Sequence, residues 1–318
     1  MIDTNNRTIE YMRLSVTDMC NFRCSYCMPD DTVLESHTLS IEDIELISYN
    51  LNKLGITKVK LTGGEPLVRN DISQIVQILK TKCNIKEVTL TTNGVLLDKH
   101  LTALEAADLD AITISIDTLN ENDFNNLVKR EQFTTVINNI KLAASSKISN
   151  IKLNCVPLKQ FGDENLISMV EFANDLNIQL RFIEMMPIGL GRKFPGYNYT
   201  ELVTVLENYY GPKQDSNTIH GNGPASYLRF DTLDIEVGLI SAVSNKFCES
   251  CNRIRITSTG HLKQCLHYNY NIDIVKTLKQ EDGLKQIEHF ILAKPKEHAF
   301  ASTNKNDIET LHMSEIGG

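Results

Sequence analysis

The sequence predicts an α/β fold with a parallel sheet, and two observations support that prediction. Six short runs of β-forming residues alternate with longer amphipathic runs up to about residue 212, which is the pattern of βα units in series. Such units form a parallel sheet with right-handed crossovers, either an open doubly wound sheet or an incomplete barrel. After about residue 215 the alternation stops and turn-rich segments follow. We therefore expect 213–318 to be a C-terminal extension of the domain formed by 1–212.

Each of the six expected strands ends in polar or glycine residues. The strands are placed at 11–18, 58–64, 87–94, 111–117, 151–158 and 179–186. Ligands of parallel α/β sheets bind beyond the carboxyl ends of the strands. We therefore expect a functional rim that consists of Thr62, Gly63, Gly64, Glu65, Thr91, Asn93, Ser115, Asp117, Asn154 and Glu184.

The segment 40–55, between the first two strands, is expected to be a helix. Ser40 is a typical N-cap with Asp43 three residues later, and Gly55 is typical of a helix end. In the extension, the sequence predicts turns and antiparallel strands, followed by a polar, helical stretch towards the C-terminus.

Composition limits the classes of function. A chain of 318 residues with 42% hydrophobic content can bury a full core. The sequence has no apolar signal region and no run approaching the 18 or so apolar residues of a membrane helix, so we expect a cytoplasmic protein with no membrane partner. A net charge of -8 argues against a nucleic-acid partner and confines any anion site to local Arg and Lys.

Six of the eight cysteines fall into two triplets. The first is C-x3-C-x2-C and the second is C-x2-C-x13-C, formed by Cys20, Cys24 and Cys27 and by Cys248, Cys251 and Cys265. Disulfides are unusual in a cytosolic chain, so metal binding is the expected role. Zinc prefers four ligands in paired C-x2-C units, whereas three cysteines can hold a four-iron cluster with one iron open. Cys83 and Cys155 lie in apolar patterns and are expected to be buried structural thiols.

The first triplet and its surroundings resemble the radical S-adenosylmethionine superfamily. Tyr26 precedes the last cysteine, the triplet follows the first strand, and GGEP ends the second strand. The resemblance implies an incomplete (βα)6 barrel of the TIM type over 1–212 and a 4Fe-4S cluster on the first triplet. The open iron would bind S-adenosylmethionine, the source of a 5′-deoxyadenosyl radical. The residues that would contact S-adenosylmethionine are Tyr26, Gly64, Ser115 and Met186.

Further motifs resemble the GTP 3′,8-cyclase family within that superfamily. They are RLSVTDMCNFRCSYCMP, LTGGEPLVRND, LTTNGVLL, ISID, RFIEMMPIG, FCESCNRIRITSTGHLKQCL and a terminal IGG. The resemblance implies abstraction of the C3′ hydrogen of GTP and formation of a C3′–C8 bond, giving 3′,8-cyclo-7,8-dihydro-GTP, the first step of molybdopterin biosynthesis. It also implies a second 4Fe-4S cluster on Cys248, Cys251 and Cys265, whose open iron would bind guanine. The implied partners are a reducing electron donor and the cyclic pyranopterin monophosphate synthase; the oligomeric state, a homodimer included, stays open.

Basic residues are expected to line the site. Arg253 and Arg255 alternate in NRIRI and therefore share one face of a strand, where they can join Arg13. The resemblance places GTP on Arg13, Lys60, Thr91, Lys152 and Arg253, with Arg181 nearby. It assigns Arg13, Arg253, Arg255 and the tail residues Gly317 and Gly318 to catalysis, the chain end entering the barrel and its carboxylate pairing with an arginine. Lys60 stands where the family has Arg, which keeps the charge and loses the bidentate fork.

Two alternatives are compatible with the same residues. A radical peptide maturase also carries C-terminal auxiliary clusters, although it usually has more than three cysteines there. A non-catalytic iron-sulfur or zinc protein that senses redox state or carries metal would show no cleavage of S-adenosylmethionine under reducing conditions.

Overall fold

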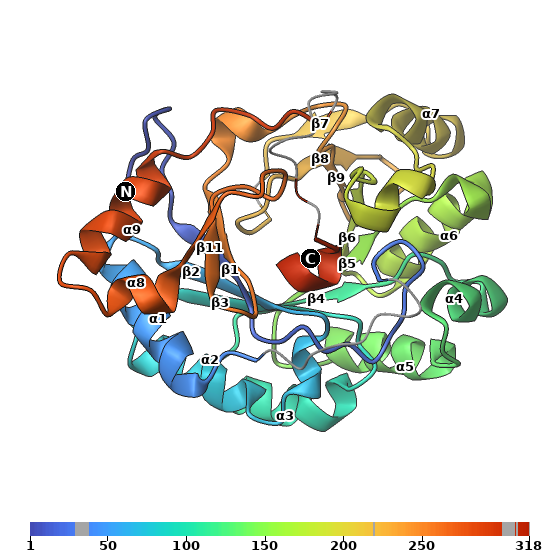
Figure 1. The fold of residues 1–318 in the computed structure, drawn as a ribbon. Helices are drawn as coiled ribbons and strands as arrows, with labels where there is room; N and C mark the ends of the chain where they lie inside the picture. The colour runs from blue at the N-terminus through green and yellow to red at the C-terminus, as the bar shows by residue number, and fades with distance from the viewer. Residues whose placement is uncertain (29–37, 219, 301–308, 310, 318) are drawn as a thin grey trace.

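Six parallel strands in chain order form the wall of an incomplete barrel (Figure 1), which confirms the predicted fold class. The structure is a computed structural model that describes all residues except 29–37, 219, 301–308, 310 and 318. The six strands are β1 (Tyr11–Ser15), β2 (Lys58–Thr62), β3 (Glu87–Thr92), β4 (Ala111–Ser115), β5 (Asn150–Cys155) and β6 (Gln179–Ile183). They end two or three residues before the predicted limits, because the polar motif residues lie in the loops that follow.

Helices cover the outside of these strands (Figure 1). They are α1 (Ile41–Lys53), α2 (Ile72–Thr81), α3 (Leu97–Ala106), α4 (Glu121–Val128), α5 (Phe133–Ala144), α6 (Gly162–Asp175) and α7 (Tyr199–Tyr210). Short 3-10 turns lie at Pro66–Val68, Lys159–Phe161, Gly189–Lys193 and Cys248–Ser250. Ser40 caps α1 as predicted, since its side chain accepts the backbone N–H of Asp43, and Gly55 follows the helix with a φ of 95°.

Charged residues occur within the apolar runs because successive side chains of a strand point to opposite faces of the sheet. The residues that face the helices are fully buried and apolar, as in Met12 and Leu14 of β1. The residues between them, such as Arg13, face the other way because side chains alternate along a strand. The cavity-lining residues of the neighbouring strands are mostly polar: several are basic or hydroxylated, and Glu87 is acidic. The interior of the barrel is therefore largely polar, while its outer layer forms the hydrophobic core.

The extension continues the sheet at both edges of the barrel, giving a 12-stranded sheet in the described part of the chain. Its strands are β7 (Gln214–Ser216), β8 (Ser226–Arg229), β9 (Val237–Ile240), β10 (Arg253–Ile256), β11 (His261–Lys263) and β12 (Asn271–Asp273). The antiparallel pairing expected here occurs within β7–β9 and β10–β12, whereas β9 pairs parallel to β6 and β10 pairs parallel to β1. The open edges of a six-stranded wall need backbone partners, and these strands supply them. The division at residue 212 stays a prediction.

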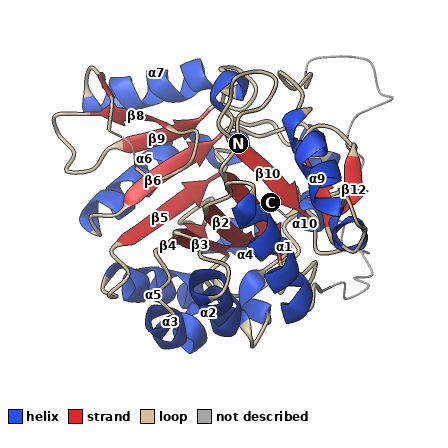
Figure 2. Cartoon of the chain, turned by 90° about the vertical axis from the view of Figure 1, so that its left-hand side faces the viewer, coloured by secondary structure: helices blue, strands red, loops and turns tan. Residues whose placement is uncertain are grey.

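The C-terminal part of the chain returns to the barrel. After α8 (Ile274–Leu278) and α9 (Gly283–Leu292), the short helix α10 (Met313–Ile316) lies within the ring of strands in Figure 1. Figure 2, turned by 90°, shows the same end close to β10. Among the described helices, none has the length and apolar character needed to cross a bilayer.

Candidate active site

One cavity of about 370 Å³ lies inside the barrel and is lined by both cysteine triplets. This volume is in the range of small-molecule sites. All eight cysteines are in the described part of the chain and none forms a disulfide there, and Cys83 and Cys155 are buried as predicted. Besides the triplets, the lining includes the predicted residues Arg13, Tyr26, Lys60, Gly64, Thr91, Ser115, Lys152, Arg181, Met186, Arg253 and Arg255.

The loop that carries the first triplet is held on the end of β2. Gly64 donates its backbone N–H to Thr17 O (2.9 Å), and Glu65 donates to Met19 O (2.8 Å). A Cβ at Gly64 would lie 2.5 Å from the carbonyl oxygens of both Asp18 and Met19. Glycine is required here because only a residue without a side chain allows this close backbone approach.

Two buried carboxylates lie beside the first triplet. Glu65 accepts hydrogen bonds from the backbone of Leu67 (2.9 Å), the hydroxyl of Thr92 (2.7 Å) and the backbone of Asn93 (2.7 Å). Burial raises the pKa of Glu65 to about 7, although these hydrogen bonds oppose the shift. Burial, and next the charge of Glu65, raises the pKa of Cys20 to about 11.

The second carboxylate, Asp117, stands behind Tyr26. The tyrosine hydroxyl donates to Asp117 Oδ2 (2.7 Å), and the backbone N–H of Val156 donates to Oδ1 (2.8 Å). Burial raises the pKa of Asp117 to about 6. The pKa of Cys24 is well above its usual value because of burial first, then its two partner thiols and Asp117. Asp117 was predicted to lie on the functional rim. It is not among the residues that line the cavity, and it instead fixes Tyr26 from behind.

The second triplet is surrounded by cations. Burial alone would raise the pKa of Cys251, but Arg253 and Lys294 lower it to about 6, and Arg253 also donates hydrogen bonds to the sulfur. Burial raises the pKa of Cys248. The backbone N–H of His298 donates a hydrogen bond to its sulfur, which opposes this rise. The two triplets thus share a ligand type and differ in charge environment.

A basic wall joins the two triplets across neighbouring strands. Arg255 of β10 is in register with Arg13 of β1, and Arg13 with Lys60 of β2. The pKa of Lys60 is well below its usual value because of burial and the charges of Arg181, Arg13 and Lys152. Burial and Arg181 lower the pKa of Lys152 to about 8. These enclosed basic groups disfavour one another's protonated forms, and an anion between them would favour those forms. The wall is therefore suited to bind an anion.

Neutral polar groups hold this wall in place. Arg181 donates from Nε to Asn154 Oδ1 (3.0 Å) and from Nη2 to the hydroxyl of Thr113 (3.2 Å). The same hydroxyl accepts a hydrogen bond from Lys60 Nζ (3.2 Å). Because these partners carry no negative charge, the positive charge of the wall is not neutralised by them.

The tail reaches the wall through Gly317. Arg255 Nη1 donates to Gly317 O at 2.7 Å, and Lys263 and Glu309 form a buried ion pair nearer the start of the tail. Gly317 has a φ of 81°, and a Cβ there would lie 2.8 Å from Ser15 Cβ. The Gly317 carbonyl is thus a partner of Arg255, whereas the predicted pairing of the chain-end carboxylate with an arginine falls on Gly318, outside the described residues.

Each triplet offers three free thiols as possible ligands of an iron-sulfur cluster. Among the described residues, no three His, Cys, Asp or Glu side chains gather where a single metal ion could be held. A four-iron cluster takes each thiolate on a different iron, so its ligands need not meet at one point. The two sets of three thiols fit such clusters better than they fit zinc, which needs a four-ligand tetrahedron.

Some residues differ from the sequence-based expectation. Glu184 does not line the cavity, because Oε2 accepts the backbone N–H groups of Val243 (2.8 Å) and Ser244 (2.9 Å). The cavity also contains residues that the sequence did not single out: 221–224, Lys294 and His298. The K-P-x-x-H spacing of the last two was the only available signal, and it lies in a stretch that reads as a polar helix.

Comparison with protein-family models gives two matches. The Radical SAM superfamily model matches residues 14–173, and the Molybdenum Cofactor Synthesis C model matches residues 178–300. Together they include both cysteine triplets and the basic wall apart from Arg13, which lies one residue before the first match.

Curated relatives match the chain from end to end. The GTP 3′,8-cyclase of Clostridium perfringens (strain 13 / Type A) is 36% identical over 325 residues, with 100% of both chains covered. The GTP 3′,8-cyclase of Peptoclostridium acidaminophilum is 37% identical over 324 residues, with 100% of this chain and 98% of the relative covered.

Solved structures support the same fold. Streptococcus suis SuiB bound to S-adenosylmethionine superposes with a TM-score of 0.65 at 16% identity, covering 89% of this chain and 68% of that chain. Native anSMEcpe with bound AdoMet gives 0.51 at 18% identity, covering 63% and 60%. At these identities the likeness concerns the fold alone. The full-length relatives and the two family models together show that the chain belongs to the GTP 3′,8-cyclase family of the radical S-adenosylmethionine superfamily.

Proposed function

We propose that this chain converts GTP to 3′,8-cyclo-7,8-dihydro-GTP, the first step of molybdenum cofactor biosynthesis. The observation that carries the proposal is the single cavity in which two thiol triplets face a basic wall. A nucleotide triphosphate supplies the anion that the wall requires. The full-length relatives named GTP 3′,8-cyclase support GTP over other nucleotides.

Membership of the radical S-adenosylmethionine superfamily implies a 4Fe-4S cluster and S-adenosylmethionine as cofactors. We assign one 4Fe-4S cluster to Cys20, Cys24 and Cys27 and a second to Cys248, Cys251 and Cys265. When bound and reduced, the first cluster supplies the electron that cleaves S-adenosylmethionine to the hydrogen-abstracting 5′-deoxyadenosyl radical.

Four residues would hold S-adenosylmethionine beside the first triplet. Backbone carbonyls around Gly64 would accept from its ammonium group, and Ser115 would bond a ribose or carboxylate oxygen. Tyr26, fixed by Asp117, and Met186 would contact the remainder of the molecule. All four line the cavity.

The basic wall would bind the triphosphate. Arg13, Lys60, Lys152 and Arg181 would make charge-assisted hydrogen bonds to its oxygens, which are about twice as strong as neutral ones. Binding of the anion would restore protonation to Lys60, whose pKa is lowered by its cationic neighbours. Arg253, which bonds Cys251, would orient the guanine and ribose with Thr91.

Arg255 and the tail would place the ribose. The guanidinium is bonded to Gly317, so the tail fixes the side chain that lies in register with Arg13. The correct orientation of C3′ towards the radical is what such positioning groups contribute to catalysis. We assign Arg13, Arg253, Arg255, Gly317 and Gly318 to this role.

The remaining partners follow from the reaction. A reducing protein or small molecule would supply electrons, and the product would pass to the cyclic pyranopterin monophosphate synthase. We propose a cytoplasmic location without nucleic-acid or membrane partners, and leave a homodimer open.

The proposal is tested by anaerobic incubation of reconstituted protein with dithionite, S-adenosylmethionine and GTP that carries deuterium at C3′. We expect deuterated 5′-deoxyadenosine together with a cyclised GTP product. Cleavage of S-adenosylmethionine without deuterium transfer or a GTP product would contradict the proposal and favour a peptide-modifying enzyme. No cleavage at all would favour a non-catalytic iron-sulfur protein.

A further inference from the structure

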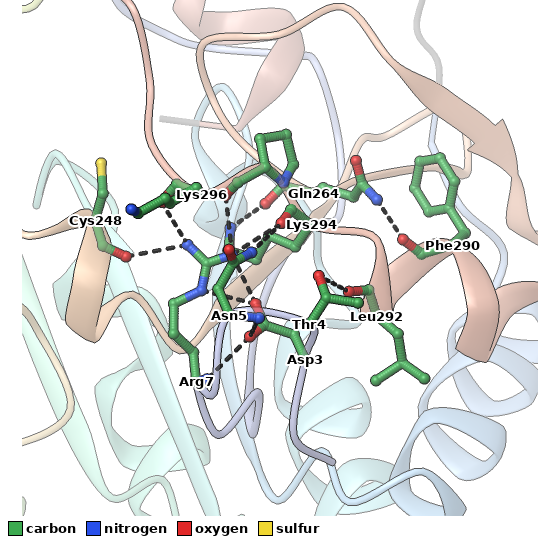
Figure 3. Close-up of polar contacts among 11 residues, drawn as sticks. Asp3, Thr4, Asn5, Arg7, Cys248, Gln264, Phe290, Leu292, Lys294 and Lys296 are labelled. Atoms are coloured by element: carbon green, nitrogen blue, oxygen red, sulfur yellow. Dashed lines mark hydrogen bonds and ion pairs between the residues drawn. The ribbon is translucent and has the colours of Figure 1, made fainter.

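The guanidinium of Arg7 is the centre of a buried network that joins residues 3–7 to Cys248 and to the segment after α9 (Figure 3). Arg7 is 4% exposed, and its Nε donates to Asp3 Oδ2 at 2.7 Å. Nη1 donates to the carbonyl of Cys248 at 3.1 Å. The other acceptors are the successive carbonyls of Lys294 (3.0 Å), Pro295 (2.9 Å) and Lys296 (3.0 Å). An arginine has five N–H donors, and this set of partners uses the whole fork.

The carbonyls bound by Arg7 belong to a segment without regular structure. Helix α9 ends at Leu292, so the carbonyl groups from Leu292 onwards have no helical partner and need others. Residues 3–7, which we call the N-terminal strap, provide them. Thr4 bonds Leu292 O through its backbone N–H (3.1 Å) and hydroxyl (3.0 Å), and Asn5 Nδ2 bonds Lys294 O (2.9 Å).

The segment 294–298 reaches the surroundings of every cysteine in the second triplet. The backbone N–H of His298 donates to the sulfur of Cys248. Lys294 is 3% exposed, and its charge acts on Cys251. Its ammonium also donates to the carbonyl of Gln264, the residue before Cys265. This one segment therefore bonds the sulfur of Cys248, places a charge near Cys251 and holds the carbonyl that precedes Cys265.

We propose that Arg7 is a positioning residue for the second triplet: it fixes the Cys248 carbonyl and the segment 294–298 relative to each other and so presets the three thiols for their cluster. The inference rests on the proposed second cluster and goes beyond it, since Arg7 is not in the cavity lining. Lysine could not replace Arg7, because its three donors diverge from one nitrogen and cannot follow carbonyls arranged around a planar fork.

The test uses full-length protein in two backgrounds that each keep one triplet. In the Cys20→Ala, Cys24→Ala, Cys27→Ala background, only the second cluster contributes iron and a Mössbauer or electron paramagnetic resonance signal. We expect Arg7→Lys to reduce that iron content and signal at least fivefold after anaerobic reconstitution. In the Cys248→Ala, Cys251→Ala, Cys265→Ala background, the same substitution should leave the first cluster and cleavage of S-adenosylmethionine within twofold.

Arg69→Lys is the matched control. Arg69 is also buried and paired with an aspartate, Asp71, and it donates to the carbonyls of Val16 and Leu39. The substitution Arg69→Lys removes a similar guanidinium from another part of the barrel. We expect the iron content and signal of the second cluster to stay within twofold of the values with Arg69. If Arg7→Lys and Arg69→Lys lower the second cluster equally, or if Arg7→Lys lowers both clusters equally, the effect is general destabilisation and the inference is wrong.

The failure of the inference is separable from failure of the proposed function. If the background that keeps only the second triplet holds no cluster with Arg7 present, the second cluster itself is absent and the proposed function fails. If that cluster forms equally well with Arg7 and with Arg7→Lys, the proposed function stands and the positioning role is overturned. If Arg7→Lys does not fold, Asp3→Asn is the alternative variant, because it keeps the guanidinium and removes its charged partner. We expect a smaller loss of iron and signal, again confined to the second cluster.

Discussion

Each of the two cysteine triplets presents three thiols to one cavity, and the charged residues beside the two triplets differ in sign. The first lies beside the carboxylates of Glu65 and Asp117, and burial together with these charges raises the thiol pKa of Cys20 and Cys24. The second lies beside Arg253 and Lys294, which lower the pKa of Cys251 to about 6. Both triplets offer three thiols, so the charged residues beside them distinguish the two sites better than the ligands do.

We expect this difference to give the two proposed clusters different tasks. Net charge and hydrogen bonds to sulfur set the reduction potential of an iron-sulfur cluster. Neighbouring carboxylates oppose the addition of an electron, so a cluster on the first triplet is expected to be the stronger reductant. Neighbouring cations favour electron-rich and anionic groups, so the second triplet is suited to hold the substrate.

Removal of either triplet should give the largest effects on cofactor cleavage and product formation. If the two removals had the same effects, the proposed difference between the triplets would be wrong. Reconstituted protein is expected to hold about eight irons, and each triple Cys→Ala variant about half. Loss of Cys20, Cys24 and Cys27 should lower cleavage of S-adenosylmethionine by about 10³-fold or more, because no other group supplies the electron. Loss of Cys248, Cys251 and Cys265 should abolish the GTP product and retain cleavage. Iron analysis and 5′-deoxyadenosine assays check this, and stoichiometric zinc in either site would contradict it.

Deletion of Gly317 and Gly318 should have the next largest effect. We expect about 100-fold less cyclised product, because Arg255 loses the Gly317 carbonyl and small displacements of a positioning group cost that much. Both clusters and binding of S-adenosylmethionine should be retained. A residue added after Gly318 is expected to act in the same direction, and a deleted variant that forms product at the parent rate would show that the tail has no role.

Arg253→Ala sharpens the comparison at the second triplet. A lost charge-assisted hydrogen bond costs about 1.5–3 kcal/mol, so GTP conversion at low GTP should fall by about 10-fold to 150-fold. Iron content should be unchanged. Because Arg253 also bonds Cys251, the spectrum of the second cluster should shift while that of the first does not. Unchanged turnover would mean that Arg253 is not part of the substrate site.

The pH dependence of GTP binding should be the smallest effect. Burial and Arg181 lower the pKa of Lys152 to about 8, so the ammonium that binds phosphate is lost as pH rises through 8. An anion raises this pKa in the complex, so binding takes up a proton and the affinity for GTP should fall by up to about tenfold between pH 7 and 9. Titrations with S-adenosylmethionine present measure this. Lys152→Met should bind more weakly with a flatter profile, and an unchanged slope in that variant would exclude Lys152.

Local sequence patterns were sufficient for the barrel and insufficient for its edges. The alternation of βα units predicts β1 to β6, and Ser40 predicts the start of α1, because these features depend on neighbours in the chain. The parallel pairing of Leu180 with Val237, and of Met12 with Ile254, joins distant segments that read as independent turns and strands. No periodicity in either segment specifies its partner.

The same limit applies to the site. Cysteine spacing predicts the triplets, and the NRIRI alternation predicts that Arg253 and Arg255 share one face, because both are short-range patterns. Lys60, Lys152 and Arg181 are assigned to the site through the family resemblance. The predicted rim wrongly included Glu184 and Asp117 in the cavity, since sequence gives the strand end and not the hydrogen-bond partner of the side chain. Lys294 and His298 were missed because they lie in a stretch that reads as a polar helix, and the contact of Lys294 with Arg7 spans 287 residues of sequence.

The contact between Arg7 and Cys248, 241 residues apart, has a consequence for biosynthesis on the ribosome. Local βα contacts form early, whereas pairings of high sequence separation form late. The first triplet can therefore be in place while the chain is still being made. The second cannot be assembled until α9 and the following segment have left the exit tunnel and met the N-terminal strap. We expect iron-sulfur assembly factors to find the first site ready earlier in synthesis than the second, so the two clusters are inserted in a fixed order.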